Sequence, residues 1–300
     1  MNLRYLGYAC INTSLEKTTN KTFRLKNLNY DKYYETVSYN LKSLEDIILW
    51  NSKNNINFFR IGSEVIPLAS HKQFNFDWEN DFKKEMNFLK KLADETNMRF
   101  TMHPGQYTVL NSQRMEVVKT AVDEIEYHAR FLDKIHPDKG KIVIHTGGVY
   151  GDKEKAKKDF IKNFELLSPL AKKMLILEND DKSFDVFDVL EISEKINIPV
   201  VFDILHHICN TPCQKPYQNL EEIIEKVVKT WKGDIPVFHL SSRKSNKGCP
   251  HTDYIRKTDF RKFISILKKI PVHSQYDIMV EAKMKEKAVI ELMKNEQFFN

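Results

Sequence analysis

Six short apolar runs along this chain each end on a histidine, an aspartate or a glutamate. The runs cover residues 100–103, 142–145, 175–178, 200–203, 237–239 and 278–281, and their last residues are His103, His145, Glu178, Asp203, His239 and Glu281. Uninterrupted apolar runs of this length are typical of strands buried on both faces, as in a parallel sheet covered by helices. In a (β/α)8 barrel the carboxyl ends of such strands meet at one rim, where active sites are built. The pattern therefore predicts a barrel whose rim gathers ligand-type side chains.

The rest of the chain fits eight alternating strand and helix units. We expect strands at residues 3–9, 57–61, 99–103, 141–145, 174–178, 199–203, 236–240 and 276–281. Amphipathic stretches with helical periodicity lie between them, at residues 30–53, 77–96, 111–136, 153–171, 185–196, 218–231, 258–269 and 284–297. One such barrel takes about 250 residues. We therefore expect residues 1–300, with 41% hydrophobic content, to form a single α/β TIM-barrel domain with its active site at the C-terminal rim of the strands.

The strand-end residues have the chemistry of a divalent-metal site. A single buried histidine or carboxylate usually satisfies a local hydrogen bond, but six at equivalent positions favour a shared function, because buried ionisable groups are rare unless paired or metal-bound. Imidazoles and carboxylates without a strand-end thiol suit Mn²⁺ or Zn²⁺. A further imidazole comes from His206 or His207, and the residues alone leave that choice open. Such a large ligand set predicts two or three ions, about 3.5–4 Å apart, as in enzymes that cleave phosphodiesters.

Several loops at the expected rim carry residues suited to nucleic acid. Gln106 and Tyr107 follow the third strand, where a tyrosine beside a glutamine can stack on a base and hydrogen-bond its edge; alternatively the tyrosine covers a neighbouring helix. His71 follows the second strand, and its side chain either reaches the centre of the rim or is solvated. After the seventh strand, Arg243 and Lys244 lie in a loop of hydroxyls and cations without acidic residues. That loop either grips phosphates or is a solvated connection.

Composition adds weaker constraints on partners and location. The net charge of +6 favours a polyanionic partner, though only mildly. Four cysteines are too few and too unevenly placed for a disulfide framework, so we expect reduced thiols. The first residues already resemble a strand, and no apolar run approaches the roughly 20 residues of a membrane span. We therefore expect a cytoplasmic protein that does not associate with membranes.

Seven segments match the motifs of one family in order and spacing. They are Gly7-Tyr8 with Asn12, and residues 59–62, 66–71, 102–107, 177–180, 203–207 and 280–283. On these motifs most of the chain resembles the UV damage endonucleases, manganese-dependent DNA repair barrels that are distantly similar to endonuclease IV. The resemblance implies incision of the phosphodiester bond immediately 5′ of UV photoproducts and other helix-distorting lesions, leaving a 3′-hydroxyl and a 5′-phosphate. It also implies damaged double-stranded DNA as the partner, two or three Mn²⁺ ions with Mg²⁺ or Zn²⁺ as alternatives, and a nucleoid-associated monomer without an obligate protein partner.

The resemblance assigns roles to the matching positions. The implied metal ligands are His103, His145, Glu178, Asp203, His206, His239, His251 and Glu281. The implied catalytic residues are Glu178 as the bridging carboxylate, His239, Glu281, and Tyr8 with His71 as the active-site lining. Gln106 and Tyr107 resemble a wedge that fills the gap opposite the lesion. We also expect Asn12, from the first motif, and Arg243 and Lys244, from the basic loop, to contact DNA. The spacing from Asp203 in the family motif selects His206 as the ligand and leaves His207 as a structural partner.

One position departs from the family pattern. Family members can carry a lysine two residues before the equivalent of His239, where it can be carboxylated beside the metals, whereas this chain has Val237. We therefore expect activity without a carboxylated lysine at that position. The main competing interpretation is a metal-dependent sugar isomerase or epimerase of the xylose-isomerase type, which uses a similar ligand set. A third is a lesion-binding module that does not cut. The Gln106-Tyr107 loop and the basic loop favour DNA.

Overall fold

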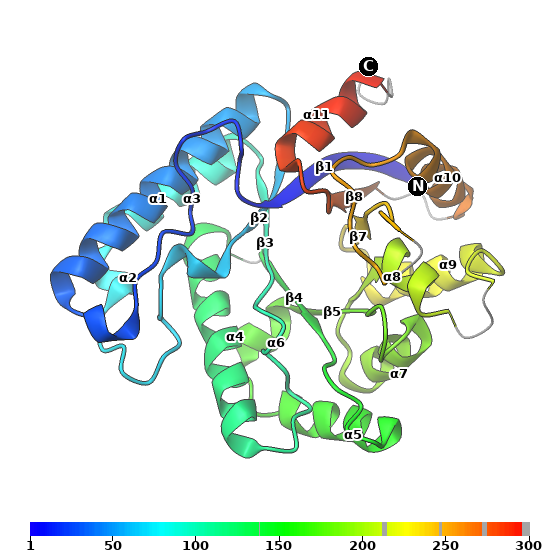
Figure 1. The fold of residues 1–300 in the computed structure, drawn as a ribbon, viewed down its shortest axis with the longest axis horizontal. Coiled ribbons are helices and arrows are strands. Elements are labelled where there is room, and N and C mark those ends of the chain that lie inside the picture. Colours follow the sequence, from blue (N-terminus) through cyan, green and yellow to red (C-terminus); the bar gives the residue numbers. More distant parts are fainter. Residues whose placement is uncertain (138, 212–214, 246–247, 272–274, 296–300) are drawn as a thin grey trace.

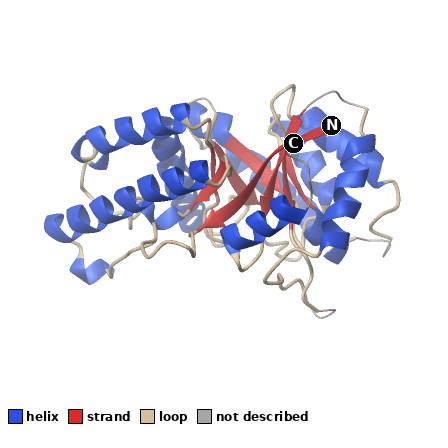
Figure 2. Cartoon of the chain, turned by 90° about the horizontal axis from the view of Figure 1, so that it is seen from above, coloured by secondary structure: helices blue, strands red, loops and turns tan. Residues whose placement is uncertain are grey.

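Eight parallel strands form a closed barrel in the computed structural model, which describes every residue except 138, 212–214, 246–247, 272–274 and 296–300. The strands are β1 (Asn2–Cys10), β2 (Phe58–Ile61), β3 (Arg99–Met102), β4 (Lys141–His145), β5 (Leu175–Glu178), β6 (Val200–Asp203), β7 (Val237–Leu240) and β8 (Gln275–Val280). Each strand pairs with the next along the chain, and β8 closes the barrel against β1. Figure 2 shows the strands at the centre with helices around them. The expected (β/α)8 fold is confirmed.

Helices connect the strands and cover the outside of the barrel (Figure 1). They are α1 (Tyr30–Lys53), α2 (Trp78–Asp81), α3 (Lys83–Glu95), α4 (Met115–Ile135), α5 (Lys153–Phe164), α6 (Pro169–Met174), α7 (Val186–Ile196), α8 (Ile204–Cys209), α9 (Leu220–Thr230), α10 (Lys257–Lys269) and α11 (Lys285–Asn295). Two 3₁₀ turns, Leu25–Asn27 and Ser63–Val65, lie in the first two connections. None of the helices in the described part of the chain is long and apolar enough to cross a membrane.

Three expected helix boundaries were wrong, each for a local reason. The single helix expected at 153–171 is α5 and α6, because Pro169 starts a new helix with Ser168 as its cap. The helix expected at 77–96 is broken at Phe82, whose ring is buried against Tyr34. The helix expected from residue 111 begins at Met115, because Asn111 donates to the carbonyl of Gly148 instead of capping a helix.

The interior of the barrel is filled by apolar side chains below the rim. One cluster contains Ala9, Phe58, Val143, Ile176, Val201, Trp231, Val237 and Met279. Side chains alternate along a strand, so Val237 and His239 share a face of β7. Val237 is fully buried and lies in the apolar layer beneath the strand-end residues. This layer separates the rim from the opposite end of the barrel.

Two cysteines contradict the expectation of reduced thiols. Cys209, at the end of α8, and Cys249, in the loop after β7, form a disulfide with their Cα atoms 6.5 Å apart. The barrel brings these two segments together, which their separation of 40 residues does not reveal. Cys10 is a free thiol, and Cys213 lies outside the described residues.

Candidate metal centre

Glu178 is the hub of the strand-end cluster. It is the last residue of β5 and is buried, with 1% of its surface exposed. Four imidazoles approach its two oxygens: those of His103, His145, His206 and His239. The distances to Oε2 are 3.4 Å from His103 Nε2 and 3.7 Å from His145 Nε2, and those to Oε1 are 3.4 Å from His206 Nδ1 and 2.8 Å from His239 Nδ1. The barrel therefore brings together residues from five different strand ends or the loops directly after them.

The protonation pattern around Glu178 fits a bound cation. His103 Nδ1 lies 2.9 Å from the carbonyl of Pro104 and donates to it, so the Nε2 that faces Glu178 carries no proton in the neutral ring. Glu178 Oε2 and His145 Nδ1 are buried without a hydrogen-bond partner among the described residues. Two acceptors that face each other at 3.4 Å repel unless a cation lies between them. The donor set is thus suited to a divalent metal ion.

Asp203 and His206 are fixed by the start of α8. Asp203 Oδ1 accepts the backbone N–H of His206 at 2.7 Å and so caps this short helix, whereas Oδ2 is buried without a partner among the described residues. Asn179 supports the pair by accepting from the Asp203 N–H and donating to its carbonyl. His206 Nδ1 lies 3.0 Å from the carbonyl of Asn179, which directs its other ring nitrogen away from the backbone. Ligand-type atoms of Glu178, Asp203 and His239 lie within 4.8 Å of one another and could hold an ion.

Arg60 is a buried cation at the same rim, for which the sequence analysis assigned no role. Its Nη2 lies 2.7 Å from Glu281 Oε1 and 3.0 Å from His239 Nε2. Because a guanidinium only donates, His239 Nε2 accepts and its Nδ1–H donates to Glu178. His251 Nδ1 lies 3.9 Å from Glu281 Oε2. The sequence feature that could have identified Arg60 as a site residue is its position inside the apolar strand β2, because a buried cation needs a carboxylate nearby.

Burial and charge shift the pKa values of the cluster in opposite directions. Burial raises the pKa of Glu178, but the imidazoles of His239 and His145 outweigh it and hold that pKa well below its usual value. Burial also raises the pKa of Glu281, but the positive charges of Arg60 and His239 outweigh it and lower that pKa to about 2. The pKa of Asp203 is raised by burial and by the neighbouring carboxylates. Carboxylates crowded into one buried site favour a compensating cation.

A groove extends from the strand-end cluster along the rim. It has a volume of about 730 Å³ and is lined by His103, His145 and His206 at the cluster and by residues 104–109 and 180–183 further out. Gln106 and Tyr107 lie on its edge, and Tyr107 is 82% exposed. Tyr107 therefore does not cover a neighbouring helix, which was the alternative interpretation of this loop.

Two residues expected at the site lie elsewhere. Tyr8 is fully buried, and its hydroxyl donates to Asn51 Oδ1 of α1 at 2.7 Å and accepts from Asn12 Nδ2 at 2.9 Å. Asn12 is also fully buried, and its Oδ1 accepts the N–H of Ser14. Neither side chain is brought into the cluster or offers surface to DNA, and we assign both a structural role that ties β1 to α1.

The remaining expected residues lie at or near the rim loops. His71 is partly exposed, and its Nδ1 accepts the N–H of Gln73. Arg243 forms an isolated antiparallel bridge with His251 and donates to the carbonyl of Gly248, while Lys244 is exposed. Two members of the expected basic loop, residues 246 and 247, lie outside the described residues. His207 points away from the cluster, with its Nε2 2.9 Å from the carbonyl of Pro216.

Comparisons with known proteins find a matching family and similar folds. Residues 4–300 match the family described as UV-endonuclease UvdE. The chain is 40% identical over 290 residues to a UV DNA damage endonuclease of Clostridium perfringens (strain 13 / Type A), covering 95% of this chain and 69% of the relative. It superposes on the crystal structure of SacUVDE with a TM-score of 0.89 and 37% identity, covering 98% and 99% of the two chains. Endonuclease IV from Thermus thermophilus has the same fold, with a TM-score of 0.65, 11% identity and 98% of each chain covered.

Proposed function

Because this chain belongs to the UV-endonuclease UvdE family and is a DNA repair endonuclease, we propose that it cuts the phosphodiester bond immediately 5′ of UV photoproducts and other helix-distorting lesions. The products would be a 3′-hydroxyl and a 5′-phosphate. The single observation that carries the chemistry is the buried Glu178 Oε2, which lies 3.4 Å from His103 Nε2 and has no hydrogen-bond partner among the described residues.

We propose that eight residues hold two or three divalent ions, with Mn²⁺ the first choice and Mg²⁺ or Zn²⁺ as alternatives. They are His103, His145, Glu178, Asp203, His206, His239, His251 and Glu281. When bound, such ions supply an activated water and stabilise the leaving oxygen of a phosphodiester. Glu178 would bridge, since both of its oxygens face imidazoles. Pro104 and Asn179 would orient His103 and His206 through their carbonyls.

The groove supports a role in gripping damaged DNA. Gln106 and Tyr107 would enter the duplex opposite the lesion, because they are exposed and have little protein to pack against. Arg243 and Lys244, on the loop after β7, would contact phosphates. His71 would line the path of the strand. The protein would work as a monomer with one domain, in the cytoplasm and in association with the nucleoid.

The sugar isomerase interpretation is less well supported. The ligand set resembles that of such enzymes, but a small-molecule site buries most of the surface of its ligand. Here the cluster opens onto a groove of about 730 Å³ with an exposed tyrosine on its edge. This shape suits an extended polyanion.

Incision of a defined duplex tests the proposal. The substrate is a duplex labelled at one end that bears a single thymine dimer, incubated with chelator-treated protein and then with added Mn²⁺, Mg²⁺ or Zn²⁺. We expect one cut, immediately 5′ of the dimer, only when metal is present, and no cut in the undamaged duplex. Cutting 3′ of the dimer, or equal cutting of both duplexes, would contradict the proposal.

A further inference from the structure

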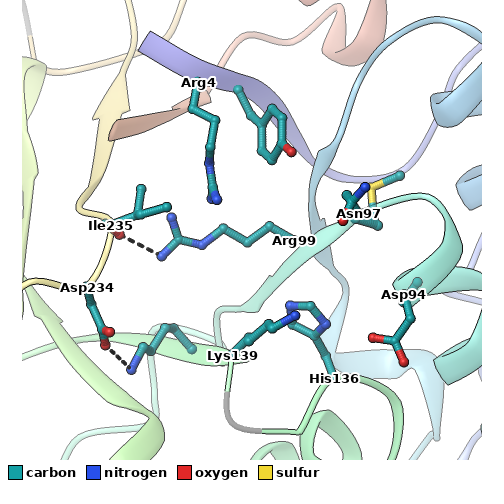
Figure 3. Close-up of a pocket in the computed structure, with 12 residues that line it drawn as sticks. Arg4, Asp94, Asn97, Arg99, His136, Lys139, Asp234 and Ile235 are labelled. Atoms are coloured by element: carbon teal, nitrogen blue, oxygen red, sulfur yellow. Dashed lines mark hydrogen bonds and ion pairs between the residues drawn. The ribbon is translucent and has the colours of Figure 1, made fainter. Parts of the chain in front are cut away.

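A second charged cavity lies at the end of the barrel opposite the metal cluster. It has a volume of about 300 Å³, and its lining residues include Arg4, Arg99 and Lys141, which lie near the amino ends of β1, β3 and β4. Figure 3 shows Arg4 and Arg99 reaching into it, with His136 and Lys139 on the other side. The apolar layer inside the barrel separates this cavity from the rim, so the metal cluster does not explain its charges.

The two guanidiniums of this cavity share one carboxylate. Asp277 is fully buried, and it accepts from Arg4 Nε at 2.9 Å, from Arg99 and from the N–H of Tyr5. Arg99 also donates a hydrogen bond from Nη2 to the carbonyl of Ile235 at 2.9 Å. One carboxylate neutralises only one of the two guanidiniums. A positive charge therefore remains among buried or half-buried groups, where it is costly.

Lys141 adds a third cation with a weak partner. The side chain is 9% exposed, and its Nζ lies 3.5 Å from Asp234 Oδ2, a carboxylate that is 67% exposed and therefore screened by water. Lys139 adds positive charge at the edge of the cavity, and Asp94 is the other carboxylate among its lining residues. Even with the shared Asp277 included, the cations outnumber the carboxylates around this cavity.

His136 lines the same cavity and has a buried polar atom without a partner among the described residues. The residue is 5% exposed, and its Nε2 is buried without a hydrogen-bond partner among the described residues. Burial, together with the charges of Lys139 and Arg99, lowers the pKa of His136 to about 4. The ring is therefore neutral at pH 7 and can offer one N–H to a ligand. A buried polar atom without a partner indicates a missing partner or bound molecule.

We propose that this cavity binds a small phosphate-bearing anion, with Arg99, Lys141 and His136 as the nitrogen donors. Guanidinium and ammonium groups match the charge and geometry of phosphate oxygens. The surplus of positive charge suits an anion, and a phosphate offers more acceptor oxygens to these three donors than a carboxylate does. A volume of about 300 Å³ is at the lower end of small-molecule sites and admits inorganic phosphate or a nucleoside monophosphate, but not a DNA duplex.

Calorimetric titration tests this site in the full chain, with chelator present to remove metal from the rim. Inorganic phosphate and thymidine monophosphate are titrated separately into wild type, Lys141→Met, Lys139→Gln and the control Lys134→Gln. Lys134 lies on α4 and pairs with Glu79 outside the cavity. Lys139 is exposed, so its replacement leaves the fold intact. Circular dichroism verifies the fold of Lys141→Met.

We expect at least one probe to bind wild type, with affinity at least tenfold weaker in Lys141→Met, about threefold weaker in Lys139→Gln and unchanged in Lys134→Gln. At ten times its Kd the bound probe should raise the Tm by about 2–4 °C. Binding of phosphate alone identifies the free ion as the ligand, and binding of both identifies a phosphomonoester site. No binding to wild type, or equal affinity in Lys141→Met and wild type, overturns the proposal.

Discussion

The guanidinium of Arg60 lies 2.7 Å from Glu281 at the carboxyl end of the barrel, where the Arg60 side chain is 8% exposed and that of Glu281 is 14% exposed. The same guanidinium lies 3.0 Å from Nε2 of His239, one of the proposed metal ligands. In the metal-free protein Arg60 thus supplies the positive charge that the cluster of carboxylates requires. A bound divalent ion would supply part of this positive charge instead.

Replacing Arg60 should therefore destabilise the metal-free protein more than the metal-bound one. Arg60→Met leaves a buried carboxylate without its cation, which typically costs about 3–5 kcal/mol. Bound Mn²⁺ should recover much of this loss. Arg60→Lys keeps the charge and is the matched control. Urea unfolding with chelator and with Mn²⁺ measures both states, and an equal loss in the two conditions would show that Arg60 does not substitute for a metal.

Replacing both Gln106 and Tyr107 by Ala should weaken binding to lesion-bearing duplex more than binding to undamaged duplex. The reason is that stacking of an aromatic ring on a base contributes about 1–3 kcal/mol, and the Tyr107 ring is exposed and so available for it. Fluorescence anisotropy with both duplexes measures the difference. Tyr34→Ala, which removes a 40% exposed tyrosine from α1, is the control. The wedge role is wrong if the double variant loses the same affinity for both duplexes.

Incision by the wild type should not respond to bicarbonate. Val237 lies in the apolar layer below His239 and cannot be carboxylated. Val237→Lys introduces an amine that could reach the metals, so its activity should need less Mn²⁺ and should rise with bicarbonate. Manganese titrations of both proteins, with and without bicarbonate, provide the test. A bicarbonate-dependent rise in the wild type, or a carboxylated lysine detected by mass spectrometry, would mean that another lysine has this role.

The stability of the fold should fall between pH 6.5 and pH 4 partly because of His136. Its pKa in the folded chain is about 4, below the ordinary value of 6.5, so the unfolded chain binds a proton first as the pH decreases. The contribution of neutral His136 to the free energy of unfolding is complete above pH 6.5. It decreases by up to about 3 kcal/mol as the pH falls toward 4. His136→Phe removes it and retains the ring contact with Phe100. Parallel curves of unfolding free energy against pH for the two proteins would refute the assignment.

The sequence was enough to predict the barrel and most of the cluster. Apolar runs that end on His145, Glu178 and Asp203 identify both the strands and the rim, because buried ionisable residues are rare without partners. His103 and Glu281 lie one residue beyond their strands rather than at the last strand position. Such an error of one residue does not move a side chain away from the rim.

Contacts between distant segments were not predictable in this way. Tyr8 belongs to the family motif, yet whether its ring faces the barrel interior or α1 depends on how β1 is oriented against its neighbours. The disulfide of Cys209 and Cys249 and the carboxylate shared by Arg4 and Arg99 depend on loops and strand ends that meet only in the closed barrel. Sequence patterns report which residues are buried, and the register of the barrel determines their partners.

Anomalous scattering from crystals grown with Mn²⁺ tests most directly whether this rim is a metal centre. We predict at least two manganese peaks in the wild type, one beside His103, His145 and Glu178 and one beside Glu178, Asp203 and His239. In crystals of Glu178→Ala, which should keep its fold but lose incision, we predict fewer peaks. A wild-type rim without manganese peaks, in a protein that still cuts dimer-bearing DNA with Mn²⁺, would contradict this account.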